Sequence, residues 1–244
     1  MNKTSLIIGA KSDIAIACAY EFAKNGFDLQ LAARDVSELC SSAQDLKIRF
    51  NIDVSLHELD VLEVSNFNSF IDSLSVLPDV TLCAIGLMGD QNNCEKDFHS
   101  SMKIFNTNFS APSILLGLIA MKYMNAKRGT IIGISSVAGL RVRGSNYFYG
   151  SAKSAFIGFL SGLRSRLHKS GIKVVTVIPG FIDTKMTKHL KLPPILTSQP
   201  EVLAKKIYKA YIDNKDILYS SLLWRIIMLA IRLLPETIFK KLEI

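Results

Sequence analysis

Short apolar runs alternate with longer stretches of helical character along the whole chain. The runs are rich in β-branched residues and leucine, which is typical of buried strands. We expect seven strands, at Ser5–Ile8, Asp28–Ala32, Leu56–Leu59, Val80–Ala84, Thr130–Ile134, Val174–Ile178 and Ile217–Tyr219. Alternation of strands and helices over a whole chain predicts an α/β fold with a doubly wound parallel sheet of about seven strands.

Two of the predicted helices have recognisable ends. One covers Ile14–Asn25 and is closed by Gly26, and the other covers Ser151–Ser170 and is closed by Gly171. A glycine at this place suits the left-handed conformation that ends many helices. Since no linker, repeat or low-complexity tract divides the chain, we expect one domain with a helical C-terminal extension.

The composition excludes several classes of protein. Of the 244 residues, 49% are apolar, so the chain is not intrinsically disordered. Its four cysteines have the spacing of neither a metal site nor a disulfide framework, and we expect no metal and a reducing, cytoplasmic location. The apolar run that ends at Gly9 is too short for a signal peptide.

One long charge-free stretch raises the question of a membrane span. It runs from Ile104 to Met121 and contains Asn106, Asn108 and Pro112 in its first half. These residues favour a buried helix with a polar start over a transmembrane helix.

The positive charge is concentrated in the last third of the chain. Residues 1–163 include fourteen basic and fifteen acidic side chains, whereas residues 164–244 include fifteen basic and six acidic ones. This imbalance indicates an acidic partner, such as an anionic membrane surface or a phosphorylated substrate, or else a solvated face. Because the segment has no recognisable nucleic-acid-binding motif, we expect no nucleic-acid partner.

In a doubly wound sheet, ligands bind beyond the carboxyl ends of the strands. After the first strand come Gly9, Lys11 and Asp13, where a helix begins. Asp13 suits the N-cap of that helix, and Lys11 would offset the repulsion between its carboxylate and a pyrophosphate. After the second strand, Arg34 suits the 2′-phosphate of NADP(H), with Lys11 as a second cation, whereas Asp35 would favour NAD(H) if it turned inward.

A tyrosine and a lysine four residues apart share one face of a helix. Four such pairs occur in this chain, and three of them also have a serine thirteen residues before the tyrosine, at Ser110, Ser136 and Ser198. Only Ser136 follows a predicted strand. We therefore select Ser136, Tyr149 and Lys153 as the candidate catalytic residues.

At this point the chain resembles the short-chain dehydrogenase/reductase family over nearly all of its length. The pieces that carry the resemblance are Gly9, Asp60-Val61, Cys83-Ala84-Ile85-Gly86, Asn108, Ser136, Tyr149, Lys153 and Pro179-Gly180-Phe181-Ile182-Asp183-Thr184. The resemblance implies a Rossmann-like dinucleotide-binding and catalytic domain over 1–219, with 220–244 as its helical extension, and a homo-oligomer. It assigns catalysis to Ser136, Tyr149, Lys153 and Asn108.

The resemblance also implies where the cofactor binds. Asp60 and Val61 would contact the adenine, Ile182 and Thr184 the nicotinamide amide, and Asn108 would hold a water of the proton relay. The cofactor-binding residues that we expect are Gly9, Lys11, Asp13, Ile14, Arg34, Asp60, Val61, Ala84, Gly86, Tyr149, Lys153, Pro179, Gly180, Ile182 and Thr184.

The chemistry of carbonyl reduction suits these residues. It needs a hydride from the nicotinamide and a proton for the developing alkoxide. A free tyrosine has a pKa of about 10, so catalysis by a tyrosine near neutral pH requires a pKa roughly three units lower. Lys153 and the positive nicotinamide would favour the tyrosinate, and Ser136 would donate a hydrogen bond to the carbonyl oxygen. We expect an NADPH-dependent carbonyl reductase.

Two motifs depart from the family pattern. Asp13 and Ala15 stand where the family has glycines, and Cys83-Ala84-Ile85-Gly86 replaces Asn-Asn-Ala-Gly. The loop 12–15, with the sequence Ser-Asp-Ile-Ala, is similar to that of a branch of the family that includes reductases of keto-sugars carried on polyprenyl phosphate. This likeness suggests a lipid-linked carbonyl substrate.

The substrate loops of the family follow the fifth and sixth strands. Six basic residues there suit either a substrate phosphate or the outer surface of a mobile lid, namely Arg141, Arg143, Lys185, Lys188, His189 and Lys191. Residues 222–234 are apolar nearly all round a helix, apart from Arg225 and Arg232 in one stripe. Such a helix packs on a partner subunit or lies peripherally at the anionic inner face of the membrane, and we favour the membrane.

Two alternative functions stay open. The same residues working in reverse would make an alcohol dehydrogenase of a lipid- or sterol-like hydroxyl compound. The same fold without turnover would serve as an NADP-sensing or scaffold protein. The complete set of Ser136, Tyr149, Lys153 and Asn108 argues against the second alternative, because a sensor needs no proton relay.

Overall fold

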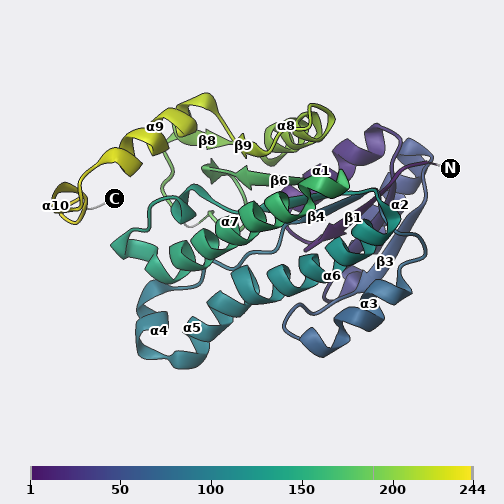
Figure 1. The fold of residues 1–244 in the computed structure, drawn as a ribbon, viewed down its shortest axis with the longest axis horizontal. Helices are drawn as coiled ribbons and strands as arrows, with labels where there is room; N and C mark the ends of the chain where they lie inside the picture. Colours follow the sequence, from purple (N-terminus) through teal and green to yellow (C-terminus); the bar gives the residue numbers. More distant parts are fainter. Residues whose placement is uncertain (1, 189, 243–244) are drawn as a thin grey trace.

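The computed structural model describes residues 2–188 and 190–242, which form a parallel sheet covered by helices on both faces (Figure 1). Seven strands pair in the order β3-β2-β1-β4-β5-β6-β9, and all neighbours are parallel. The strands are β1 (Thr4–Ile8), β2 (Asp28–Ala33), β3 (Val54–Glu58), β4 (Val80–Cys83), β5 (Thr130–Ile134), β6 (Lys173–Ile178) and β9 (Ile217–Tyr219). The predicted doubly wound sheet is confirmed.

Alternate residues of each strand face opposite layers. Ile7 points toward α1, α2 and α8, whereas Leu6 and Ile8 point toward α3, α6 and α7. The helices are α1 (Asp13–Lys24), α2 (Cys40–Phe50), α3 (Phe67–Ser73), α4 (Gln91–Lys96), α5 (Phe98–Phe105), α6 (Ala111–Ala126), α7 (Tyr147–Leu167), α8 (Pro200–Ile212), α9 (Leu222–Leu233) and α10 (Glu236–Phe239). A small second sheet pairs β7 (Phe181–Ile182) with β8 (Thr197–Ser198).

The predicted helix ends are close to those observed. Gly26 and Gly171 both adopt a positive φ, at 78° and 72°, as the sequence analysis expects. Helix α7, however, begins at Tyr147 rather than at Ser151, so Tyr149 and Lys153 both lie within it, one turn apart.

The charge-free stretch forms part of a continuous helical segment, Phe98–Ala126, which is long and apolar enough by composition to cross a membrane. Half of its most apolar window is buried inside the fold, where Leu115, Leu116 and Ile119 pack on the sheet. This burial is typical of a core helix, in agreement with the sequence analysis.

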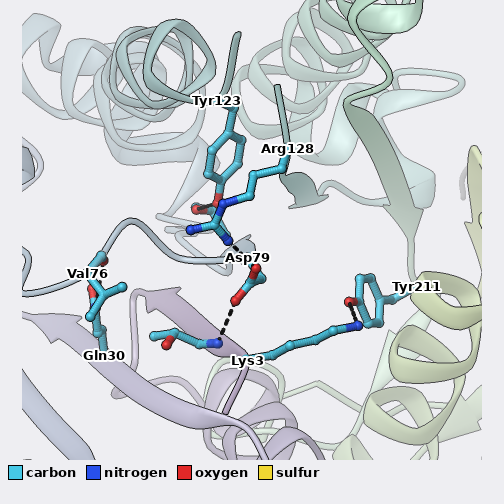
Figure 2. Close-up of polar contacts among 9 residues, drawn as sticks. Lys3, Gln30, Val76, Asp79, Tyr123, Arg128 and Tyr211 are labelled. Carbon is cyan, nitrogen blue, oxygen red and sulfur yellow. Dashed lines mark hydrogen bonds and ion pairs between the residues drawn. The ribbon is translucent and has the colours of Figure 1, made fainter. Parts of the chain in front are cut away.

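The end of the sheet where the strands begin is fastened by polar contacts (Figure 2). The Asp79 carboxylate accepts a hydrogen bond from the Thr4 backbone N–H at 2.9 Å and pairs with Arg128. Beside it, the buried Tyr123 hydroxyl bonds the Thr81 hydroxyl at 2.7 Å. These contacts join β1, β4 and the turn before β5, so they hold the end of the sheet opposite to the ligand-binding edge.

The C-terminal helix α9 is anchored to the carboxyl end of the sheet. Trp224 and Met228 are buried against Val137 and Ile178. The Trp224 indole N–H donates to the Leu196 carbonyl at 2.8 Å. Figure 1 shows α9 and α10 at the end of the molecule away from its amino terminus.

Candidate active site

A cavity of about 960 Å³ opens at the carboxyl ends of β1, β4, β5 and β6. The strand order reverses between β1 and β4, which is where ligands bind in open α/β sheets. The structure brings twelve of the predicted site residues to this cavity, namely Lys11, Asp13, Ile14, Ala84, Gly86, Ser136, Tyr149, Lys153, Pro179, Gly180, Ile182 and Thr184.

Five predicted site residues do not line the cavity. Arg34, Asp60 and Val61 lie beyond it, after β2 and β3, and Asn108 is fully buried. Gly9 lies behind the wall with a φ of 81°, and a Cβ there would be 3.1 Å from the backbone of Ala84. Glycine is therefore needed at position 9 both for the turn and for the close approach of β1 to β4.

The start of α1 differs from the prediction. Ser12, not Asp13, is the N-cap, because its hydroxyl accepts the Ala15 N–H at 3.2 Å. The Asp13 carboxylate instead accepts the backbone N–H of Lys185 at 2.6 Å. Lys11 pairs with Glu38 at 2.6 Å and also lines the cavity, so the offset of the Asp13 charge by Lys11 beside a pyrophosphate stays a prediction.

At the end of β2, the Arg34 side chain is 62% exposed and its nearest recorded acid is Asp60, at 3.9 Å. Asp35 adopts a left-handed conformation with a φ of 52°. Glu58 accepts the backbone N–H groups of Asp35 and Val36 at 2.8 and 3.2 Å. The Glu58 carboxylate is thus bound to the backbone of the turn after β2, whereas the Arg34 guanidinium extends into solvent.

Tyr149 lies in the first turn of α7 and is only 8% exposed. Burial raises its pKa to about 12, and a hydrogen bond with the Ser136 hydroxyl opposes the rise. Ser136 follows β5, where its Oγ also accepts the Ala138 N–H at 3.1 Å. Burial in the protein alone therefore favours the protonated phenol, whereas the lowered pKa expected in the sequence analysis depends on Lys153 together with the positive nicotinamide of the bound cofactor.

Lys153 is 2% exposed, one helical turn after Tyr149. Its ammonium donates to the carbonyls of Ile85 and Ile134 at 3.1 and 3.3 Å and lies 5.8 Å from the centre of the Tyr149 ring. Burial lowers the pKa of Lys153 to about 8, against a weaker opposing effect of the Cys83 thiol. The lysine thus joins the ends of β4 and β5 beneath the tyrosine.

Asn108 lies in a π-helical segment, Asn106–Ser110, between α5 and α6. Its side-chain oxygen accepts the Leu87 N–H at 3.1 Å, and its amide donates to the carbonyls of Leu87 and Ile104 at 2.7 and 2.9 Å. Single turns of π-helix are frequent at functional sites. The Asn108 side chain thus ties Leu87, in the loop after β4, to Ile104 in α5.

The cavity also has a wall that the sequence analysis missed. It comes from the loop after β4 and from α4, and includes Met88, Gln91, Cys94 and Glu95. The run Gln91-Asn92-Asn93 has no apolar periodicity, so nothing in its pattern distinguishes it from an ordinary surface loop.

The predicted basic cluster is divided by the fold. Arg143, Lys185 and Lys191 line the cavity. Arg141 does not, because it pairs with Glu236 at 2.6 Å instead. Lys188 does not line it either, and His189 lies outside the described residues.

Across residues 2–188 and 190–242, no group of three His, Cys, Asp or Glu side chains is placed to hold a metal ion. The chemistry available at the cavity is therefore that of a phenol, a hydroxyl and an ammonium, arranged beside a helix start that suits phosphate. Such an arrangement matches proton transfer to a substrate oxygen.

Comparison with known proteins defines the class. Residues 3–193 match the short chain dehydrogenase family, and the chain belongs to this family of oxidoreductases that act on CH–OH and C=O groups. An uncharacterized oxidoreductase of Mycobacterium tuberculosis is 32% identical over 240 residues, which cover 97% of this chain and 96% of the relative. A 3-oxoacyl-[acyl-carrier-protein] reductase of Chlamydia trachomatis is 28% identical, over 78% of each chain.

Solved structures share the fold. A short-chain dehydrogenase from Sphingobium yanoikuyae in complex with NADPH has a TM-score of 0.82 and 22% identity, over 93% of each chain. A ketone-specific alcohol dehydrogenase from Comamonas testosteroni has a TM-score of 0.81 and 21% identity, over 93% of this chain and 91% of that one.

Proposed function

We propose that this protein is an NADPH-dependent carbonyl reductase in which Ser136, Tyr149 and Lys153 act on the substrate. One observation carries the proposal: the Ser136 hydroxyl, the Tyr149 phenol and the Lys153 ammonium line one cavity, where burial favours the protonated form of the phenol. A protonated phenol is a proton donor, as reduction requires. The same tyrosine would act as the base in the reverse reaction, the oxidation of an alcohol, so the ratio of reduced to oxidised cofactor sets the direction.

The residues around the cavity fit a dinucleotide with a 2′-phosphate. The first residues of α1 line the cavity, and the N-terminus of a helix attracts phosphate. At the end of β2, Arg34 offers an exposed cation, while Glu58 is held by the turn. NADPH, which the Sphingobium relative binds, supplies the hydride when bound. Asp60 and Val61 are placed after β3 for the adenine side of the molecule.

In the proposed mechanism, the Tyr149 hydroxyl donates its proton to the substrate oxygen as negative charge develops there. The Ser136 hydroxyl donates a hydrogen bond to the same oxygen. Two of the three Lys153 donors are engaged by backbone carbonyls, which leaves the third for ribose hydroxyls. Asn108 is a positioning residue, since its side chain holds the loop after β4.

For the nicotinamide amide we propose Ile182 and Thr184. Both line the cavity after β6, and Ile182 lies in the short strand β7. The Thr184 hydroxyl lies 3.2 Å from that of Thr187, whose own proton goes to the Ile182 carbonyl at 2.6 Å. These contacts order the segment that would face the nicotinamide.

The substrate that fits the site best is a keto-sugar carried on polyprenyl phosphate. Apolar side chains such as Met88, Phe148 and Leu192 line the cavity together with the cation Arg143. A ligand with an anionic group beside a long apolar chain matches both features. The family resemblance of loop 12–15 supports the same class of substrate.

A lipid-linked substrate requires access to a membrane, and we propose the outer face of α9 as the contact surface. Leu222, Ile226, Leu229 and Leu233 are all exposed along this face. Arg225 and Arg232, which are also exposed, lie beside it, and Lys240 and Lys241 follow α10. An apolar stripe flanked by cations suits the anionic inner surface of a membrane.

Flotation with vesicles tests the membrane contact. Leu229→Glu places a charge in the middle of the apolar face, and we expect it to abolish binding to anionic vesicles. Ile48→Glu is the matched control, because Ile48 is 76% exposed on α2 while Leu229 is 61% exposed. Self-association that Leu229→Glu abolishes, without flotation of the wild type, would assign the face to a second copy of the chain instead.

Turnover tests the reductase. The purified protein should oxidise NADPH in the presence of a polyprenyl-phosphate keto-sugar. Tyr149→Phe should lower kcat by about 10²- to 10⁴-fold, the usual contribution of a general acid, while NADPH affinity is kept. Tyr147→Phe, an exposed neighbour, is the control. Near-normal turnover by Tyr149→Phe would overturn the mechanism, whereas absence of turnover in the wild type would favour the sensor or scaffold alternative.

A further inference from the structure

The loop between β5 and α7 contains two arginines whose side chains lie in different environments. Arg141 contacts the C-terminal segment, where it pairs with Glu236 and lies 4.3 Å from the centre of the Phe239 ring. Arg143, two residues later, is half-buried and lines the cavity that contains Ser136 and Tyr149.

Within the described residues, no hydrogen bond or ion pair is recorded for the Arg143 guanidinium. The three acids that line the same cavity are engaged elsewhere. Asp13 accepts the Lys185 N–H, Asp90 accepts the Asn93 N–H at 2.8 Å, and Glu95 accepts the Gln91 amide at 2.9 Å. The Arg143 guanidinium is therefore partly withdrawn from water, and burial lowers its pKa, with no acid of the described residues paired to it.

A second unsatisfied polar group lies on the same loop. The side-chain oxygen of Asn146 is buried without a hydrogen-bond partner in the described part of the chain, and Asn146 also lines the cavity. The Asn146 backbone N–H donates to the Arg143 carbonyl at 3.2 Å, so the two residues belong to one tight turn. A buried acceptor of this kind is satisfied by a donor such as a hydroxyl group.

The position of this turn is fixed from both sides. On one side, Arg141 attaches it to α10 through charge and ring contacts. On the other, α7 begins at Tyr147, and Tyr149 follows within the same first turn of helix. An anion held by Arg143 would therefore lie at a fixed place relative to the phenol that donates the proton.

We propose that Arg143 is the anion-binding residue of the substrate site and that it takes a phosphate attached to the reacting sugar, with Asn146 accepting a bond from a neighbouring hydroxyl. The proposal rests on the reductase function above and makes it more specific. The phosphate is either the headgroup of a lipid-linked sugar or that of a free sugar phosphate. Arginine suits both, because its planar guanidinium binds two phosphate oxygens at once.

A binding experiment tests Arg143 without relying on turnover. The NADPH-bound protein is titrated with a short polyprenyl phosphate, with the corresponding neutral polyprenol and with inorganic phosphate, and Trp224 fluorescence or calorimetry reports binding. We expect Arg143→Gln to raise the Kd for polyprenyl phosphate by about 10- to 100-fold, the range of a charged hydrogen bond, and to leave the Kd for the neutral polyprenol unchanged. Arg143→Lys should recover part of the affinity, because lysine keeps the positive charge but lacks the planar group that binds two phosphate oxygens at once.

The controls separate the alternatives. Arg166→Gln removes an exposed arginine of α7 outside the cavity and should change none of the affinities. Equal binding of inorganic phosphate and polyprenyl phosphate by the wild type would identify the ligand as a free phosphate. Loss of NADPH affinity in Arg143→Gln, or equal loss for the neutral polyprenol, would overturn the proposal.

The same variants separate this inference from the proposed function. If the wild type binds polyprenyl phosphate through Arg143 but reduces no carbonyl compound, the reductase function fails and the anion site stands. If it reduces a keto-sugar phosphate and Arg143→Gln leaves both KM and kcat unchanged, the reductase stands and the anion site fails.

Discussion

The indole of Trp224 lies directly against Gly180. A Cβ at position 180 would be 2.0 Å from the indole nitrogen, far closer than any real contact. The same nitrogen donates to the Leu196 carbonyl at 2.8 Å, and the ring packs edge-on to Phe181 at 5.1 Å between ring centres. Helix α9 therefore fits against the cavity wall only because residue 180 has no side chain.

Gly180→Ala should displace this ring. Overpacking of a filled site destabilises by about 1–3 kcal/mol, and we expect a loss of that size in the free energy of unfolding. Trp224 is the single tryptophan of the chain, so its fluorescence should shift as the ring moves toward solvent. Gly158→Ala is the control, because a Cβ there meets open space on α7 and should stabilise the helix. Unchanged stability and emission in Gly180→Ala would contradict the packing.

Asp13 links the start of α1 to the segment after β7 through its bond to the Lys185 N–H. Asp13→Ala removes a hydrogen bond to a charged acceptor, so local opening of 183–192 should become roughly tenfold more frequent. Limited trypsin digestion would show this as faster cleavage after Lys185 and Lys188. Ser12→Ala removes the N-cap of the same helix. It should lower the free energy of unfolding of the protein without a selective increase in cleavage after Lys185 and Lys188.

Arg34 is expected to determine the preference for the phosphorylated cofactor. Arg34→Gln should raise the Kd for NADPH by about 10- to 100-fold, which corresponds to one or two charge-assisted hydrogen bonds, and leave the Kd for NADH unchanged. Lys11→Gln should have a smaller effect, because Lys11 is paired with Glu38. Equal weakening of NADPH and NADH binding by Arg34→Gln would place the side chain elsewhere than at the 2′-phosphate.

Lys153 should make stability depend on pH. Burial lowers its pKa to about 8, below the ordinary lysine value of about 10.4. Between these two values the unfolded chain binds a proton that the folded protein has released, so the contribution of this group to stability rises with pH. The difference between the two pKa values corresponds to about 3 kcal/mol.

Urea unfolding of the wild type and of Lys153→Met at about pH 8 and about pH 10 measures this contribution. Other groups titrate in the same range, but they are common to both proteins and cancel in the difference. The stability of the wild type relative to Lys153→Met should increase toward the higher pH. A constant or falling difference would show that Lys153 keeps its charge in the folded protein, and Lys47→Met, on the exposed surface of α2, is the control.

The apolar pattern of the sequence was sufficient to predict the seven strands of the sheet. A buried strand is a short apolar run, and such a run can be recognised without knowing which strands pair with it. Strand β3 and helix α7 show the limit of this pattern. Strand β3 begins at Val54 rather than at Leu56, because the polar Ser55 interrupts the apolar run, and α7 begins with aromatic residues before its regular spacing starts. Tyr149 and Lys153 were identifiable because both lie on one helix at a fixed spacing.

The remaining parts of the site depend on contacts between residues far apart in the chain. Arg141 and Arg143 are indistinguishable in sequence, yet the partner of Arg141 is Glu236, ninety-five residues later. Asp13 resembles an N-cap, but Lys185 presents its N–H from 172 residues away and Ser12 takes the capping role. The raised pKa of Tyr149 likewise follows from burial, which no local motif reveals.

The contact of Arg141 with α10 has a practical consequence for handling the protein. An affinity tag or surface attachment placed after residue 244 would begin a few residues from Glu236 and Phe239, which hold the loop that carries Arg143. The opposite end of the molecule is a safer point of attachment, because the amino-terminal end of the chain lies away from α10 (Figure 1). Kinetic constants measured on C-terminally tagged protein would otherwise include the effect of the tag on substrate binding.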